Sequence, residues 1–521
     1  MRARSSRLII LAVLVTQIIL ATAPTQAQTP KQLSITVICF EFPDIPHTAS
    51  ISTIRSTAID QVNKFYQQVS YGQLTITGEI YGWYMISEPL KQFDVCRWDL
   101  SSADAWRLVQ LALSVAEANH VKKGATSYTF LVFSGAVWGF AYESLKTSAQ
   151  NEKHTWGTYA HELGHVIGLP DLYSYAEARR GGNSFIFAGP WDIMSMSTSG
   201  TMCAWSRIKA GWIQRNQVTK LELGSSATIS PLELGKGILV ARIEYYFATR
   251  YYLVEVRLGY GVLITEIDET RAGGEGIVTV IDAHPGSLYG VTDACFDLTD
   301  GPPGSLFSGE AVPVWINPYR TMAIILLSKN GENYKISLGN ADMGNRALEA
   351  HKTIESAKLS IKKAESEIRV EGLDQAKATL ERATLQYQET QFTDCSLLAQ
   401  NAKTRADKAT IPKSYYQAKE MIETTDNRLK TLLARKLESS DAAAKRDEAV
   451  AAMNKSQNTF KSLQFDTALT DLEYCNSLIS ETELLEQDFQ TRKWVAVTLG
   501  AVTLGLLLAK RKRHADCYKP N

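Results

Sequence analysis

An apolar run near the C-terminus limits what this chain can fold into more than any other feature. Residues 494–509 are all apolar, glycine or threonine, and four basic residues, 510–513, follow at once. In a bilayer such a segment must be helical, because each backbone polar group then needs a partner within the segment. A buried core helix is the alternative, but a basic tail has no reason to adjoin a core. We expect a single transmembrane helix over 494–509, with flanking basic side chains that snorkel, and a basic cytoplasmic tail over 510–521.

The N-terminus carries a second, shorter apolar run. Basic residues precede residues 8–20, and small residues follow as far as Ala27. This order is typical of a secretory signal peptide, here residues 1–27. An uncleaved anchor is the alternative, although the run is shorter than the ~20 residues of a spanning helix. The two ends together predict a single-pass protein of the cell membrane, with an extracellular body and a short cytoplasmic C-terminus.

Charge and cysteine content narrow the function classes. The formal net charge is zero and no basic field spans the chain, which argues against a nucleic-acid binder. Six cysteines fall in the predicted extracellular body, where disulfides can form, and none has C-x-x-C spacing. Their pairing cannot be read from the sequence, and two of them fit buried thiols at least as well as a disulfide. The six are Cys39, Cys96, Cys203, Cys295, Cys395 and Cys475. Cys395 and Cys475 are the two that fit buried thiols.

The predicted body divides into three regions by composition. Residues 33–214 alternate strands and helices, an α+β or α/β pattern, with a helix capped by Ser101 or Ser102 and a buried strand over Tyr128–Phe133. Residues 215–340 are rich in strands punctuated by Gly and Pro, which predicts a sandwich-like or barrel-like domain packed on the first region. Residues 341–492 contain no Trp and place Ala, Ile and Leu at 3–4 spacing, which predicts an α-helical stalk of hairpin or coiled-coil type.

The helical region also contains a weak internal repeat. Residues 387–392 (Tyr-Gln-Glu-Thr-Gln-Phe) match 460–465 (Phe-Lys-Ser-Leu-Gln-Phe), and a similar stripe of small and apolar residues follows each. We interpret 341–492 as two hairpin-like helical repeats. A spacer is the simplest role for this stalk, and oligomerisation through it is the alternative.

A motif typical of metal-dependent hydrolysis lies at residues 161–171. His161 and His165 are four residues apart on a predicted helix, so both imidazoles can reach one metal ion from the same face. Glu162 lies next to the first ligand, where its carboxylate can take a proton from a water molecule on the zinc and later pass it to the leaving amine. This spacing predicts a catalytic zinc site.

A third ligand is expected just beyond the helix. Gly168 permits a turn with positive φ that ends the helix and returns the chain to the metal. Asp171 then arrives as the third, oxygen ligand, with Glu177 and Asp192 as competitors. Three protein ligands leave a fourth position for water, as a catalytic zinc requires.

These residues resemble the zinc signature of the immune-inhibitor-A-like family of secreted metallopeptidases, in the metzincin clan. In that signature Asp stands where many other metzincins have a third His. Residues 191–194 (Trp-Asp-Ile-Met) resemble the family's Met-turn, which implies that Met194 lies beneath the zinc as an apolar floor, with Met196 as a competitor. Segments 42–44, 70–72, 205–212 and 251–257 also match, so the resemblance covers 33–338. The resemblance implies an α+β metzincin-like catalytic domain with one catalytic Zn²⁺. Bound Ca²⁺ is an additional possibility, but the sequence shows no evident calcium-binding loop.

Taken together, these features predict a cell-surface-anchored zinc-dependent endopeptidase acting on extracellular proteins or peptides. One alternative is a surface-layer or adhesion protein that uses an inactive or weakly active peptidase fold as a binding module; the intact Glu162 argues against it. Another is a processing enzyme specific for one neighbouring surface protein. An extended substrate is expected against an edge strand, for which 128–134 is the candidate. His154, His284 and residues 138–142 are further candidates for lining the cleft.

Overall fold

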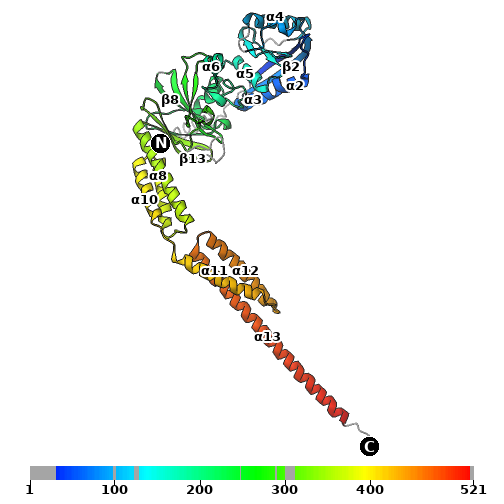
Figure 1. Cartoon of the computed structure of the whole chain (residues 1–521), viewed down its shortest axis with the longest axis vertical. Helices are drawn as coiled ribbons and strands as arrows, with labels where there is room; N and C mark the ends of the chain where they lie inside the picture. Colours follow the sequence, from blue (N-terminus) through cyan, green and yellow to red (C-terminus); the bar gives the residue numbers. More distant parts are fainter. Residues whose placement is uncertain are drawn as a thin grey trace, which may run out of the picture. The chain divides into compact units, whose positions relative to one another are not determined.

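The computed structural model describes residues 31–97, 101–122, 128–246, 248–287, 290–299 and 311–516. The chain divides into two compact units, Met1–Leu348 and Glu349–Asn521. A mixed α/β unit with three sheets precedes a helical unit that ends in one long apolar helix (Figure 1). The predicted signal peptide over 1–27 and Cys517 lie outside the described residues.

The first sheet of the α/β unit has five strands in the order β2-β1-β3-β5-β4. The strands are β1 (Lys31–Glu41), β2 (Leu74–Met85), β3 (Tyr128–Phe133), β4 (Phe140–Tyr142) and β5 (Thr147–Asn151). Only the β4–β5 pair is antiparallel among the pairs described in this sheet. Every residue of β3 is buried because this strand lies between β1 and β5. The expectation that 128–134 forms an edge strand is therefore wrong, and β4 is the edge on that side of the described sheet.

Helices cover both faces of this sheet (Figure 1). On one face, α2 (Ile51–Arg55), α3 (Gln61–Val69) and α5 (Trp156–Val166) share a core with alternate strand residues such as Val37 and Phe130. On the other face, α4 (Ser102–Ala118) packs on the intervening residues, such as Ile38 and Leu131. As predicted, α4 is capped by Ser101, whose hydroxyl accepts a hydrogen bond from the backbone N–H of Asp104. Two short helices, α6 (Tyr175–Arg180) and α7 (Ala204–Lys209), follow α5.

The β-rich part of the same unit contains the other two sheets, in the orders β11-β10-β9-β8-β6 and β12-β13-β14-β7. One core cluster draws on both, for example Val254 and Leu326. The opposite face of β9 and β11 packs on the first sheet's core, since Leu253 and Val278 share a cluster with Leu163 of α5. The strands are β6 (Val218–Lys220), β7 (Ser226–Ile229), β8 (Val240–Tyr246), β9 (Arg250–Arg257), β10 (Gly261–Asp268), β11 (Val278–Ile281), β12 (Val314–Ile316), β13 (Ala323–Asn330) and β14 (Asn333–Gly339).

Small residues fill the seams between helices in the C-terminal region. Ala376 of α9 and Cys395, Ala399 and Ala402 of α10 are buried, which lets these helices pack closely. The six cysteines of the described residues are free thiols, and only Cys96 is exposed. The helices are α8 (Ala341–Ser366), α9 (Leu373–Gln388), α10 (Phe392–Asp407), α11 (Lys413–Leu433), α12 (Ser440–Lys461) and α13 (Phe465–Asp516).

The two repeated sequence segments adopt the same turn. Thr390 between α9 and α10 has φ of 63°, and Leu463 between α12 and α13 has φ of 61°. The next residue in each case donates its N–H to a carbonyl five residues earlier, the bond that closes a helix in a Schellman motif. The similarity of the two segments is therefore also one of backbone conformation.

Helix α13 is long and apolar enough to cross a membrane over Phe465–Lys510. Its first part packs against α11 and α12, whereas the apolar side chains from Trp494 onward are exposed. Trp494 is 74% exposed and Leu499 is 61% exposed. Within the described residues no protein segment covers this stretch of α13.

Candidate metal centre

Helix α5 carries the two histidines and Glu162 of the predicted motif. The helix begins after Thr155 and extends to Val166, so His161 and His165 lie one turn apart on the same side. Their rings are nearly perpendicular, with centroids 5.1 Å apart. His161 and Glu162 are each only 8% exposed.

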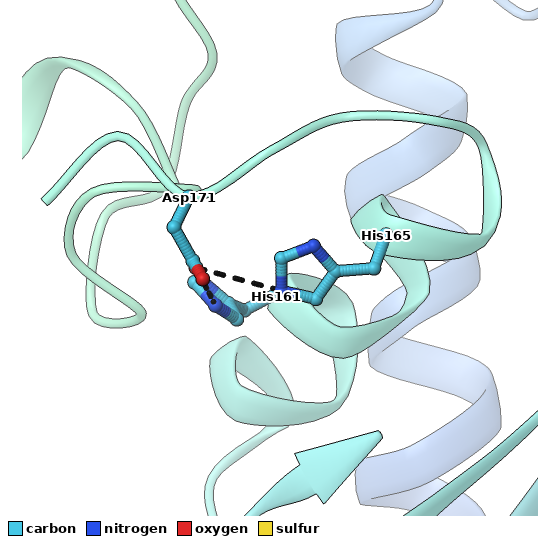
Figure 2. Close-up of side chains that lie close together, drawn as sticks. All are labelled: His161, His165 and Asp171. Atoms are coloured by element: carbon cyan, nitrogen blue, oxygen red, sulfur yellow. Dashed lines mark ion pairs between the residues drawn. The ribbon is translucent and has the colours of Figure 1, made fainter. Parts of the chain in front are cut away.

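The chain reverses direction directly after α5. Gly168 has φ of 89°, which confirms the predicted turn, and the N–H of Leu169 donates to the carbonyl of Gly164 at 3.1 Å. The reversal brings Asp171 back to the helix, with its Oδ1 atom 3.0 Å from His161 Nε2 and 3.4 Å from His165 Nε2 (Figure 2). The three donor atoms lie within 4.8 Å of one another.

Backbone carbonyls fix the orientation of both imidazole rings. The Nδ1–H of His161 donates to the carbonyl of Ile193, and the Nδ1–H of His165 donates to that of Leu169, each at 2.9 Å. A neutral imidazole protonated at Nδ1 presents a lone pair at Nε2. Both Nε2 lone pairs therefore face Asp171, and a hydrogen bond from the other ring nitrogen to a carbonyl is typical of metal-binding histidines.

The surroundings of Asp171 Oδ1 show whether a cation would fit between this atom and the two Nε2 atoms. This atom is buried and accepts no hydrogen bond from the described residues. Two imidazole nitrogens and one carboxylate oxygen thus converge with lone pairs only, and this donor set suits zinc. Without a cation, the neighbouring carboxylates favour a protonated imidazole at His161. Burial alone would lower the pKa of His161, but the Asp171 and Glu162 carboxylates more than offset this and raise it to about 9.

Tyr175 and a loop of the β-rich part hold Asp171 in position. The Tyr175 hydroxyl donates to Asp171 Oδ2 at 2.5 Å, and the N–H of Gly274 donates to the Asp171 carbonyl at 3.0 Å. Tyr175 in turn donates its N–H to the carbonyl of Gly274. Neither partner was predicted from the sequence, although Tyr175 lies only four residues after Asp171. The Gly274 contact has no local sequence signal, because it joins distant parts of the chain.

The two competing carboxylates lie elsewhere. Asp192 is fully buried, and its oxygens accept the N–H groups of Met194 at 2.8 Å and Cys203 at 3.0 Å. Glu177 forms an ion pair with Arg180 in α6 at 3.0 Å. Neither belongs to the group of donor atoms around His161 in the described structure.

Met194 packs directly against α5, the helix that carries both histidines. It is fully buried, and a Cβ atom at Gly164 would lie 2.3 Å from its sulfur, so only glycine allows this approach. The preceding residue, Ile193, supplies the carbonyl that orients His161. The segment containing Met194 thus holds α5 from one side.

A buried ion network supports that segment from the β-rich part. Arg257 of β9 donates to Glu255 at 2.8 Å and to the hydroxyl of Thr201 at 2.5 Å. Thr201 accepts the N–H of Ile193 at 2.9 Å, and Glu255 accepts the N–H of Ala204 at 2.6 Å. A chain of hydrogen bonds therefore links β9 to the carbonyl that fixes His161.

A cavity of about 490 Å³ lies over the three donor atoms. Glu162 and Tyr173 line it, as do Gly139, Phe140 and Ala141 at the exposed edge of the first sheet. A Cβ atom at Gly139 would lie 3.6 Å from the Glu162 carboxylate and 3.5 Å from the His154 ring. Part of the 138–142 candidate thus lines the cavity. His154 lies beside it, and His284 is bonded to the Asp293 carbonyl in the β-rich part.

Residues 101–226 match the family model of the immune inhibitor A peptidase M6 catalytic domain. The match includes the three donor residues, Glu162 and Met194, and it is shorter than the 33–338 suggested by the motifs. No curated protein matches the chain significantly in sequence. Over residues 101–226, which include the candidate metal centre, the chain is therefore similar to the peptidase M6 catalytic domain, and this similarity supports a metallopeptidase.

Proposed function

We propose that this chain is a zinc-dependent endopeptidase anchored at the cell surface. Its parts would be a metzincin-like catalytic domain over 33–214, a sandwich-like domain over 215–340, a helical stalk over 341–492 and a membrane span over 494–509. The observation that carries the proposal is the convergence of His161, His165 and Asp171 in an open cavity that Glu162 also lines.

The donor atoms assign roles to the protein's own groups. His161 Nε2, His165 Nε2 and Asp171 Oδ1 would hold the ion, with Met194 beneath as the floor. Zinc, when bound, supplies Lewis-acid polarisation and lowers the pKa of water. Glu162 would accept a proton and later deliver it to the leaving amine. Burial raises its pKa, which brings it closer to the neutral range in which an acid–base group is effective.

The edge of the first sheet suits an extended peptide substrate. Strand β4 pairs with β5 on one side and, among the described residues, with no strand on the other. Its residues Phe140 and Ala141, with Gly139 before them, line the cavity beside Glu162. A peptide added to this edge would gain main-chain hydrogen bonds and pass the carboxylate. We therefore propose β4 in place of the edge strand expected from the sequence.

Proteolysis of a denatured protein tests the enzyme, with and without a chelator and after restoration of zinc. We expect cleavage by the purified chain to stop on chelation, return with zinc, and fall by about 10²–10⁴-fold in Glu162→Ala. Glu177→Ala, which alters a carboxylate in α6 away from the donor group, should retain activity. Cleavage that survives both chelation and Glu162→Ala would refute the zinc mechanism. Tight peptide binding without turnover would favour the binding-module alternative.

The exposed apolar part of α13 supports membrane anchoring. Full-length protein should remain in the membrane fraction through alkaline extraction, and a chain ending at Lys493 should be released into the medium. Secretion of the truncated chain would also support an extracellular body. Release of the full-length chain by alkaline extraction would contradict the anchor without affecting the peptidase assay.

A further inference from the structure

We infer that the loop between α11 and α12, residues 434–439, lies on the membrane surface and contacts anionic phospholipid headgroups. This α11–α12 loop is far in sequence from the apolar segment of α13, but the structure places it beside the start of that segment (Figure 1). The inference rests on the proposed membrane span.

A set of polar contacts joins the α11–α12 loop to α13. The N–H groups of Glu438 and Ser439 donate to the carboxylate of Glu486 at 3.1 and 3.0 Å. The Glu438 side chain accepts hydrogen bonds from Gln490 at 3.1 Å and from Lys493 at 2.6 Å. These contacts hold the loop against the last two turns of α13 before Trp494.

The position of these contacts sets the height of the loop. Lys493 immediately precedes the apolar segment, and each residue of a helix adds about 1.5 Å along its axis. The loop therefore lies within about two helical turns of the point where the hydrocarbon core would begin. Trp494, like other tryptophans at the ends of spans, suits the interface. With the apolar segment inserted, the loop must sit at headgroup level.

The chemistry of the loop suits this location. Arg435 and Lys436 are exposed and have no ion-pair partner among the described residues, whereas Lys493 is neutralised by Glu438. Just before them, Leu433 is 48% exposed at the end of α11. Unpaired basic side chains are attracted to anionic phospholipid surfaces, and an apolar side chain beside them can enter the interface. The loop thus presents two free positive charges and one apolar side chain.

Depth-dependent fluorescence quenching in vesicles tests the inference with the full-length chain. A fluorophore is attached to single cysteines introduced as Leu433→Cys, Lys436→Cys, Leu499→Cys or Ser462→Cys. The background carries Cys96→Ser and Cys517→Ser; the other five cysteines are buried. Ser462 is the matched control, because it lies in the α12–α13 turn at the opposite end of α12 and is also exposed. Leu499 reports on the span itself.

We expect lipids that carry a quencher deep in the acyl chain to quench the label at Leu499, and headgroup quenchers to quench the labels at Leu433 and Lys436. Neither should quench the label at Ser462. Headgroup quenching at Leu433 should be stronger with phosphatidylglycerol than with phosphatidylcholine alone, and Arg435→Glu with Lys436→Glu should remove that difference. Quenching at Leu499 with none at Leu433 or Lys436 would overturn the loop contact and leave the span in place. No quenching at Leu499 would overturn the span, and the loop contact with it. Equal quenching in both lipids would overturn the recognition of anionic headgroups.

Discussion

Around the candidate metal centre, two of the bonds that fix functional groups join residues that are far apart in the chain. His161 is oriented by the carbonyl of Ile193, and Asp171 is held by Gly274 of the β-rich part. In the helical region, by contrast, the α9–α10 turn is closed by bonds between residues three to five positions apart. A substitution in the β-rich part should therefore disturb the geometry of the candidate metal centre. The stability of the α9–α10 hairpin should change only when residues between its own helices are substituted.

The largest expected effect on stability comes from breaking a buried ion pair, with an exposed ion pair as the comparison. Arg257→Met leaves the carboxylate of Glu255 buried without its partner, which should lower the free energy of unfolding by about 3–5 kcal/mol. Lys358→Ala in α8 breaks an exposed pair with Glu355 and should cost at most about 1 kcal/mol. Chemical denaturation of both variants measures the difference. Similar losses of unfolding free energy in the two variants would mean that the Arg257–Glu255 pair contributes no more to stability than an exposed ion pair.

The second test enlarges a side chain in a helical seam. Ala402 is fully buried between helices, so Ala402→Leu should destabilise the helical unit by about 1–3 kcal/mol through overpacking. Zinc affinity and peptide cleavage should not change. In the same helix Leu397 is 69% exposed, and Leu397→Ala should alter stability by less than about 0.5 kcal/mol. Thermal unfolding and zinc titration together would reveal any unexpected coupling to the metal centre.

The third test removes one hydroxyl from the support of the predicted third ligand. Tyr175→Phe deletes the hydrogen bond to Asp171 Oδ2 and should weaken zinc binding by about 10–100-fold. Tyr142→Phe, on β4, removes the same chemical group from a residue outside the donor set and should bind zinc normally. Competition with a zinc-sensitive dye measures both affinities. Normal zinc binding by Tyr175→Phe would argue against Asp171 as a ligand.

The fourth test concerns the dependence of stability on pH. Burial lowers the pKa of His154 from 6.5 to about 4, so the unfolded chain binds a proton at this residue before the folded chain does. The folded state should therefore lose stability as the pH falls from 6.5 towards 4. His154→Gln should show a smaller loss over this window when urea unfolding is measured at several pH values. An unchanged pH dependence would contradict this assignment.

The sequence predicted those parts of the site that depend on local geometry. The positions of His161, His165 and Gly168 follow from helix periodicity and from one positive-φ turn, and these bring Asp171 back within six residues. Gly274 was missed because its contact with Asp171 depends on how distant segments pack, and Tyr175 was missed although it lies only four residues from Asp171. The ligand roles themselves stay predictions.

The first sheet shows the same limit. The apolar run of β3 identified a strand correctly, but a strand buried on both faces belongs inside a sheet, and its assignment to an edge was wrong. Strand β5 was missed because it is short and polar, although four of its five residues are buried. Gln150 within it bonds to Ser148 and His154, partners that the fold supplies. Periodicity of apolar residues gives no signal for such a strand.

Helix α13 passes from the bundle with α11 and α12 into the apolar segment without interruption. In a bilayer, a change of hydrocarbon thickness alters the tilt of a spanning helix. Since no hinge separates the two parts of α13, the bundle would lean through the same angle as the span. The lipid composition of the membrane would then set the tilt of the α11–α13 bundle as well as that of the span.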